Sequence, residues 1–125
     1  MNRPDPYDRG MEVRREVLGD DHVDRAVEQT TDLNRGFQEL ITRYAWGEVW
    51  SRPGIDRRAR SMITLALLAA LGHEDELAMH VRAAVRIGLS AEEISEVLLH
   101  TAIYAGVPVA NRALAVAQTV LAEES

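Results

Sequence analysis

Residues 56–93 read DRRARSMITLALLAALGHEDELAMHVRAAVRIGLSAEE, and this stretch decides the fold class. It predicts one helix over residues 56–71 and another over 74–87, because each helix-forming segment is followed by a glycine suited to a helix C-terminus. Ser90 and Glu93 then form an S-x-x-E capping box, which marks the start of a third helix. Three successive helices without an alternating apolar pattern between them indicate an all-α fold.

Helix start and stop signals continue on both sides of this stretch, and no convincing strand pattern interrupts them. A chain of 125 residues suits one domain and is too short for two ordinary ones, so we expect a single compact helical domain over residues 1–125. The further helices expected run from Pro6 to Gly19, from Asp20 to Gln29, from Thr31 or Asp32 to about Trp50, from Ser90 to about Ala105 and from Pro108 to about Glu123.

Two of the expected helices are apolar on nearly every side. The helix over residues 56–71 carries almost only apolar residues after Ser61, and the last helix is similarly apolar. A helix that is apolar all round must be buried on most sides, which one small core cannot easily provide. We therefore expect other subunits of a homo-oligomer to cover part of this surface. The alternative is a helix at the centre of a monomeric bundle.

The composition excludes several classes of chemistry. The chain has neither cysteine nor lysine, which excludes disulfides, thiolate metal sites, dithiol redox chemistry and Schiff-base mechanisms. A net charge of −6 without a long basic cluster argues against nucleic-acid binding. The longest apolar run, residues 62–71, is about half of a membrane span, and residues 1–6 lack the apolar stretch of a signal peptide. We expect a soluble, cytoplasmic protein that binds no membrane.

His80 is the first candidate catalytic residue. In the helix over residues 74–87, the side chains of Leu77, His80, Ala84 and Ile87 share one stripe, so His80 faces inward among apolar groups. A half-buried imidazole is a natural proton donor or acceptor near neutral pH. The alternative is a core histidine whose ring is satisfied by a backbone carbonyl.

Glu48 is the second candidate. It continues a stripe formed by Phe37, Leu40, Ile41 and Tyr44 at helical spacing. At the end of such a stripe, a carboxylate is either a buried acid awaiting a partner or a residue at the rim of the core.

Aromatic and basic side chains near Glu48 suggest a pocket for a planar acid. Trp46 and Trp50 flank Glu48, as simple packing or as walls for a planar ring. Arg52 and Arg58 belong to a cluster of arginines whose planar guanidinium groups can bind carboxylates in a bidentate way. The alternative is a solvated, charged turn. The other arginines of the cluster are Arg57 and Arg60, and its nearby acidic partners are Asp56 and Glu48.

The remaining histidines indicate no metal site. Glu76 and His80 have i, i+4 spacing, but no third ligand accompanies them, so we expect no bound metal. We expect His22 and His73 to lie at the surface and His100 at the surface or in an interface.

Several stretches resemble the γ-carboxymuconolactone decarboxylase family. They are YAWGEVWSRPGIDRR at residues 44–58, ELAMHVRAA at 76–84, and EEISEV at 92–97 leading to YAGVP at 104–108 with Asn111. The likeness runs from about Asp5 to Ala122, and its later stretches also resemble the wider alkylhydroperoxidase D-like superfamily. Peroxidases of that superfamily carry a CxxC pair one turn before a histidine. Here His73 and Glu76 occupy the cysteine positions and His80 matches the histidine, so the chain departs from the redox branch.

The resemblance implies an alkylhydroperoxidase D-like all-α domain that assembles into a trimer-based ring, as a trimer or a hexamer. It also implies an enzyme without a cofactor that releases CO2 from γ-carboxymuconolactone and gives β-ketoadipate enol-lactone, in the protocatechuate branch of the β-ketoadipate pathway. A related lactone with another side chain is an alternative substrate.

The implied reaction needs three services from the protein. The anionic arm of the substrate must be anchored, for which we choose Arg52 or Arg58. The growing oxyanion must be stabilised and a carbon protonated, which we assign to His80 and Glu48 without separating their roles. Tyr44, Trp46 and Trp50 are assigned to substrate binding. The competing hypotheses are a hydroperoxide reductase, which would need a dithiol, and a non-catalytic oligomeric module that binds a small acid or a partner helix.

Overall fold

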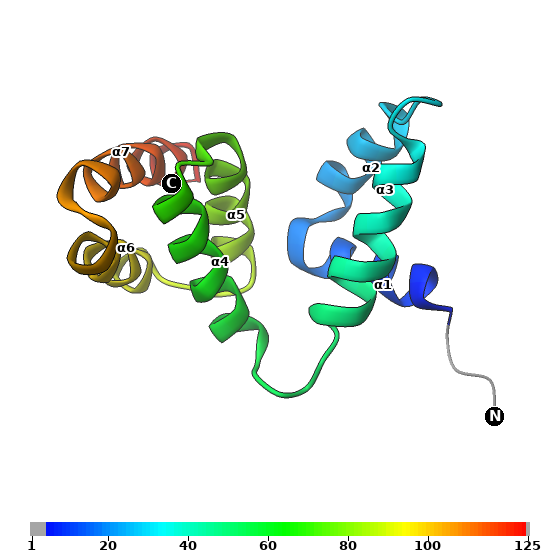
Figure 1. Cartoon of the computed structure of the whole chain (residues 1–125), viewed down its shortest axis with the longest axis horizontal. Helices are drawn as coiled ribbons and strands as arrows, with labels where there is room; N and C mark the ends of the chain where they lie inside the picture. The colour runs from blue at the N-terminus through cyan, green and yellow to red at the C-terminus, as the bar shows by residue number, and fades with distance from the viewer. Residues whose placement is uncertain (1–4, 125) are drawn as a thin grey trace. The chain divides into compact units, whose positions relative to one another are not determined.

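The computed structural model describes residues 5–124, over which the chain forms seven α-helices, one π-helix and no strand. The prediction of an all-α fold is confirmed. Residues 1–4 and 125 lie outside the described residues, and with them most of the N-terminal segment that argued against a signal peptide. The described part of the chain divides into two compact units, unit 1 up to residue 55 and unit 2 from residue 56 (Figure 1). The expected single domain stays a prediction.

Unit 1 is built from short helices that pack on α1. The carboxylate of Asp5 accepts a hydrogen bond from the backbone N–H of Tyr7 at 2.8 Å and caps α1. Gly19, with φ of 92°, ends α1 as predicted. Both η1 and α2 contact α1. The elements of unit 1 are α1 (Pro6–Leu18), α2 (Asp20–Glu28), α3 (Arg35–Leu40) and the π-helix η1 (Ile41–Val49).

The expected helix from Thr31 or Asp32 to Trp50 is wrong in two respects. The side-chain oxygen of Asn34 accepts a hydrogen bond from the N–H of Thr31 at 2.7 Å, and this turn delays the helix start to Arg35. From Ile41 onward the helix is of the π type, because each N–H pairs with a carbonyl five residues back, as Trp50 does with Ala45 at 2.9 Å.

The π-helix changes which side chains share a face, because each turn holds an extra residue. Phe37 and Tyr44 are 59% and 65% exposed, so the stripe that leads to Glu48 is not buried. Thr42 and Trp46 are the buried side chains instead.

Glycine brings α1 and η1 into backbone contact. A Cβ atom on Gly10 would overlap the carbonyl oxygen of Thr42 and lie 2.9 Å from the nitrogen of Gly47. A Cβ atom on Gly47 would likewise overlap the carbonyl oxygen of Pro6. The two helices can approach this closely only because both positions lack a side chain.

Unit 2 is a bundle of four helices (Figure 1), and its core is aliphatic. Its elements are α4 (Arg57–Leu71), α5 (Glu74–Arg86), α6 (Ala91–Ala105) and α7 (Val107–Glu124). Both α5 and α6 contact α4 and α7, so the four helices close around one interior. That interior is filled by Leu65, Ala69, Leu77, Val81, Ala84, Leu89, Ile94, Leu98, Ala113, Ala117 and Val120.

The predicted caps of unit 2 are confirmed. The carboxylate of Asp56 accepts from the N–H of Ala59 at 2.8 Å, and Gly72 takes the left-handed conformation at the end of α4. In the capping box, the N–H of Glu93 donates to the Ser90 hydroxyl at 3.0 Å. The N–H of Ser90 donates to the Glu93 carboxylate at 2.9 Å.

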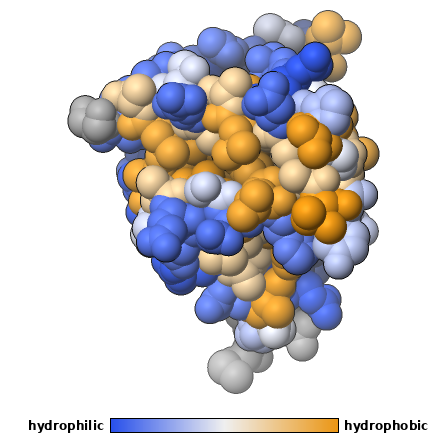
Figure 2. Space-filling view, turned by 90° about the vertical axis from the view of Figure 1, so that its left-hand side faces the viewer, coloured by the Kyte–Doolittle hydropathy of each residue, from blue (hydrophilic) through white to orange (hydrophobic). Residues whose placement is uncertain are grey.

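The chain by itself does not bury the helix over residues 56–71 on most sides, so the alternative of a helix at the centre of a monomeric bundle is wrong, and the expected cover by other subunits stays a prediction. Only one side of α4 is buried, and Ile63, Leu67 and Leu71 are 49%, 55% and 67% exposed. Further apolar side chains are exposed on α6 and α7, and Figure 2 shows apolar residues gathered on the face it presents. The exposed apolar side chains of α6 and α7 are Leu99, Ile103, Tyr104, Val107 and Leu114. Within residues 5–124, no helix combines the length and the apolarity needed to cross a membrane.

Candidate functional site

The segment with the predicted aromatic residues and Glu48 lies on η1, at the end of unit 1. Trp46 is buried, and its ring stacks on that of Trp50 with 4.9 Å between centroids and 30° between planes. The two rings therefore pack on each other, one turn apart, while Tyr44 is exposed. The alternative in which the tryptophans serve as packing groups accounts for Trp46.

Glu48 is half exposed and lies at the surface of unit 1. Its side chain is 53% exposed, and Oε1 lies 3.3 Å from Nη2 of Arg9 on α1. The Nε atom of Arg9 also donates to the carbonyl oxygen of Gly47 at 2.8 Å. Of the two alternatives for Glu48, the structure favours the rim position over the buried acid.

A second arginine of α1 holds the middle of η1. Arg14 is buried and donates from Nη1 to the Thr42 hydroxyl and from Nη2 to the Gln38 side chain, both at 3.2 Å. Burial in this environment lowers the pKa of Arg14, because desolvation disfavours the charged form. The Thr42 hydroxyl in turn donates to the carbonyl of Gln38 at 2.7 Å.

The predicted arginines Arg52 and Arg58 occupy different surroundings. Arg52 is exposed, in the turn that follows η1. Arg58 of α4 donates from Nη1 to the carbonyl oxygen of Gly88 at 2.7 Å and forms an ion pair with Glu93 through Nη2. The hydrogen bond with Glu93 raises the pKa of Arg58, and the same bond lowers the pKa of Glu93. Arg58 thereby links the start of α4 to the start of α6.

His80 lies on the inward face of α5, as its spacing predicts. It is 8% exposed, between Leu77 and Ala84, which are 1% and 0% exposed. The outward positions of α5 behave as expected, since Arg82 and Arg86 are exposed. The prediction of an inward-facing imidazole is confirmed.

The other histidines and Glu76 lie at or near the surface. His73 and His100 are exposed as expected, whereas His22 is half-buried. Glu76 is exposed on α5, one turn before His80. Among residues 5–124 no three histidine, cysteine or acidic side chains cluster closely enough to hold a metal ion.

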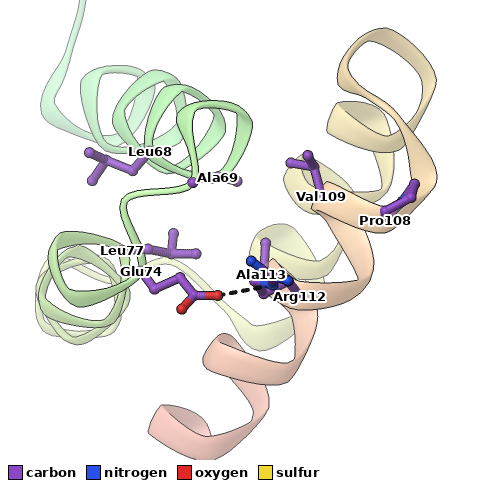
Figure 3. Close-up of a pocket in the computed structure, with 9 residues that line it drawn as sticks. Leu68, Ala69, Glu74, Leu77, Pro108, Val109, Arg112 and Ala113 are labelled. Carbon is purple, nitrogen blue, oxygen red and sulfur yellow. Dashed lines mark ion pairs between the residues drawn. The ribbon is translucent and has the colours of Figure 1, made fainter.

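Unit 2 contains a small apolar cavity between α4, α5 and α7, with a volume of about 160 Å³ (Figure 3). Leu68, Leu77 and Val109 contribute apolar walls, while Glu74 reaches toward Arg112 and pairs with it at 3.3 Å.

Two further hollows of unit 2 lie between α4 and α6 and between α6 and α7. None of the seven predicted site residues lines any of these three cavities. The catalytic assignment of His80 therefore depends on its burial and on family relationship rather than on these cavities.

The sequence reasoning missed Arg9 and Arg14. The contact from Arg9 to Gly47 spans 38 residues, so no helical spacing could reveal it. One signal was present, because Gly10 and Gly47 stand inside helices, where glycine costs about 0.5–1 kcal/mol relative to alanine. A glycine at such a position indicates a close approach of two backbones.

The fold and these residues define an all-α protein whose reactive groups are imidazole, carboxylate and guanidinium. The model of the carboxymuconolactone decarboxylase family matches residues 35–119, which is more than half of the chain. The chain belongs to this family, and the resemblance predicted from its sequence is confirmed.

Two relatives cover most of the chain. A 4-carboxymuconolactone decarboxylase of Acinetobacter baylyi is 51% identical over 96% of this chain and 90% of the relative. A nitrosuccinic acid decarboxylase of Metarhizium robertsii is 44% identical over 90% of this chain and 78% of the relative. A shorter sequence, a 4-carboxymuconolactone decarboxylase of Pseudomonas putida, is 56% identical over 38% of this chain and its own full length. All three relatives are decarboxylases.

Proposed function

We propose that the chain is a carboxy-lyase that decarboxylates 4-carboxymuconolactone and gives β-ketoadipate enol-lactone, in protocatechuate catabolism. The observation that carries this proposal is the 51% identity, over 96% of the chain, with a decarboxylase of that substrate. The aligned region is 96% of the chain and therefore contains the segments around Glu48 and His80.

The chemistry explains how a chain without lysine can decarboxylate. The bond between the γ-carbon and its carboxylate breaks, and the electron pair moves through the ring double bond to the lactone carbonyl oxygen. The ring is then an enolate-type anion, and a proton added to the carbon beside the carbonyl gives the product. Because the substrate accepts its own electrons, the protein need only bind the anion, stabilise the oxyanion and deliver a proton.

His80 and Glu48 are proposed for the proton and oxyanion steps. His80 is supported by its place on the inward face of α5, where an imidazole can exchange a proton with little interference from bulk water. Glu48 is supported by the hydrogen-bonded contact that Arg9 makes with its carboxylate. A donor placed at the oxyanion is typically worth about 3–4 kcal/mol.

Arg52 and Arg58 are the two candidates for anchoring the substrate's carboxylate arm. Arg52 is exposed in the turn after η1, and Arg58 lies at the start of α4, where its terminal nitrogens contact the Gly88 carbonyl and Glu93. Tyr44 and Trp50 are proposed as contacts for the ring, with Trp46 as the buried support on which Trp50 stacks.

We also propose that the active protein is a homo-oligomer, a trimer or a hexamer built as a ring, in the cytoplasm. Its support is the amount of apolar surface exposed on unit 2, including Leu67 and Ile103 at 55% and 75%. Contiguous exposed apolar surface on a folded chain commonly marks a protein interface.

The second candidate function is the decarboxylation of nitrosuccinic acid, which the 44% identity with the fungal relative favours. In that substrate a nitro group, rather than an unsaturated lactone, would accept the electron pair released with CO2. Both substrates carry an anionic carboxylate arm, and both decarboxylations form a carbanion that must be protonated.

The deciding experiment measures CO2 release and loss of substrate absorbance with enzymatically prepared 4-carboxymuconolactone, and separately with nitrosuccinate. We expect the larger kcat/KM for the lactone, and the reverse order would assign the second function. His80→Gln and Glu48→Gln should each lower kcat by about 10²–10⁴-fold. The matched control is His100→Gln, since His100 is an exposed histidine on α6. Near wild-type turnover by both His80→Gln and Glu48→Gln in folded oligomers would contradict the assignment.

A further inference from the structure

A single guanidinium group ties α1 to two consecutive residues at the end of η1. The Nε atom of Arg9 donates to the Gly47 carbonyl at 2.8 Å, and its Nη2 atom lies 3.3 Å from Oε1 of Glu48. The Arg9 side chain is 31% exposed, which is less than the 53% of Glu48. One side of the planar group therefore contacts both the backbone and the carboxylate.

The helix that carries Arg9 is itself held firmly against η1. Gly10, the next residue, lies in backbone contact with Thr42, and Gly47, the residue before Glu48, lies in backbone contact with Pro6. The hydrogen bond between Arg14 and Thr42 adds a side-chain contact one turn further along α1. The backbone at Arg9 on α1 and the backbone at Gly47 and Glu48 on η1 therefore have little freedom to move apart.

The contact with Arg9 restricts the orientation of the Glu48 carboxylate, in addition to placing a positive charge beside it. The five N–H groups of a guanidinium lie in one plane, so fixing Nε on the Gly47 carbonyl also fixes the direction of Nη2. Glu48 is otherwise a flexible, half-exposed side chain, for which a lone surface ion pair would contribute little. A lysine at position 9 could make one of these two contacts but not both in the same plane.

We propose that Arg9 is a positioning residue for Glu48, which it orients for the proton-transfer step of the decarboxylation. This inference rests on the function proposed above. It assigns a catalytic contribution to α1, which precedes residues 35–119, the part of the chain that the family model matches. Arg9 acts through Glu48 and need not touch the substrate.

The test is a double-mutant cycle with four proteins: wild type, Arg9→Gln, Glu48→Gln and the double variant. Arg9→Gln should lower kcat by about 10–100-fold, the size typical of a misplaced reacting group, while KM changes by less than about threefold. In the Glu48→Gln background, Arg9→Gln should have no further effect on kcat. Arg9→Lys should recover part of the loss, since it keeps the charge but only one contact.

The matched control is Arg15→Gln on the same helix. Arg15 pairs with Asp20 and Asp24 of α2 at 3.2 and 2.9 Å, so its removal breaks two ion pairs between α1 and α2 and leaves the contacts of Arg9 with η1 in place. We expect wild-type kcat for this variant. An equal loss of kcat in Arg9→Gln and Arg15→Gln would overturn the inference, because it would indicate general damage to α1.

Three other results would also overturn it: unchanged kcat in Arg9→Gln, multiplied effects of Arg9→Gln and Glu48→Gln in the double variant, or a slow Arg9→Gln beside a fully active Glu48→Gln.

A separate readout distinguishes failure of the proposed function from failure of the positioning role. If the wild type releases no CO2 from the lactone, the function fails. The position of Glu48 is then followed by the ¹³C resonance of its carboxyl carbon, identified by its loss in Glu48→Gln. A shift of that resonance in Arg9→Gln, but not in Arg15→Gln, supports the positioning role, and an unshifted resonance overturns it.

Discussion

Replacing Gly10 by alanine should destabilise the protein, although alanine is the better helix former. The new Cβ atom would overlap the Thr42 carbonyl oxygen and lie 2.9 Å from the Gly47 nitrogen, whereas ordinary contact begins at 3.4 Å. Both obstacles are backbone atoms, which cannot rotate away as a flexible side chain can. The two helices must therefore part by more than about 0.5 Å along their contact.

The magnitude follows from two opposing effects. Overpacking of a tight contact costs about 1–3 kcal/mol, and the backbone obstacle favours the upper end. Alanine in a helix interior returns about 0.5–1 kcal/mol relative to glycine. We therefore expect the free energy of unfolding to fall by about 2 kcal/mol, which lowers Tm by about 6–10 °C for a chain of this length.

The assay is thermal unfolding followed by circular dichroism, at one fixed protein concentration. The control is Gly36→Ala, since Gly36 is also helical and nothing lies within 4 Å of the position of its Cβ. That variant should be as stable as the wild type or slightly more stable. If the Tm of Gly10→Ala lies within about 1 °C of the Tm of Gly36→Ala, the reasoning is refuted, because a Cβ atom at position 10 would then not clash with the backbone of η1.

Three further predictions concern unit 2. Glu93→Gln keeps the capping box but removes the charge that faces Arg58, so it should lower Tm at pH 7. Because the ion pair lowers the pKa of Glu93, its stabilisation is complete above the ordinary value of 4.5 and is lost as the pH falls through the lower folded-state pKa, so the Tm difference should shrink in acid. Ser90→Ala removes a helix cap and should cost about 1 kcal/mol, measured by denaturant unfolding. Ile103→Glu replaces a 75% exposed side chain and should reduce oligomer size in sedimentation without unfolding the chain, and an unchanged sedimentation coefficient would exclude this face from the interface.

Helix ends in unit 2 were predictable because their signals are local. Asp56, Gly72 and the Ser90–Glu93 pair satisfy backbone groups within a few residues of themselves, and the structure confirms each of them. The inward face of α5, with His80, was predictable for the same reason, since helical periodicity relates only near neighbours.

The conformation of residues 41–49 could not be predicted in this way. A π-helix and an α-helix have similar local requirements, and the choice here accompanies contacts with α1, through Gly10 and Arg14. The extra residue in each turn of η1 changes the face on which Tyr44 lies, and with it the expected surroundings of Glu48, whereas Phe37 is exposed on α3, before the π-helix begins.

Sequence alone determined the all-α class, the caps of α4 and α6, and the inward orientation of His80, because each depends on residue type and short-range spacing, and its stretches also carried the resemblance to the family. Only the tertiary structure decided which groups meet across long separations. Arg9 reaches Glu48 across 39 positions, and Arg58 reaches Glu93 across 35. Such contacts depend on how whole helices pack, and helix packing is set by the summed burial of many side chains rather than by any one local signal.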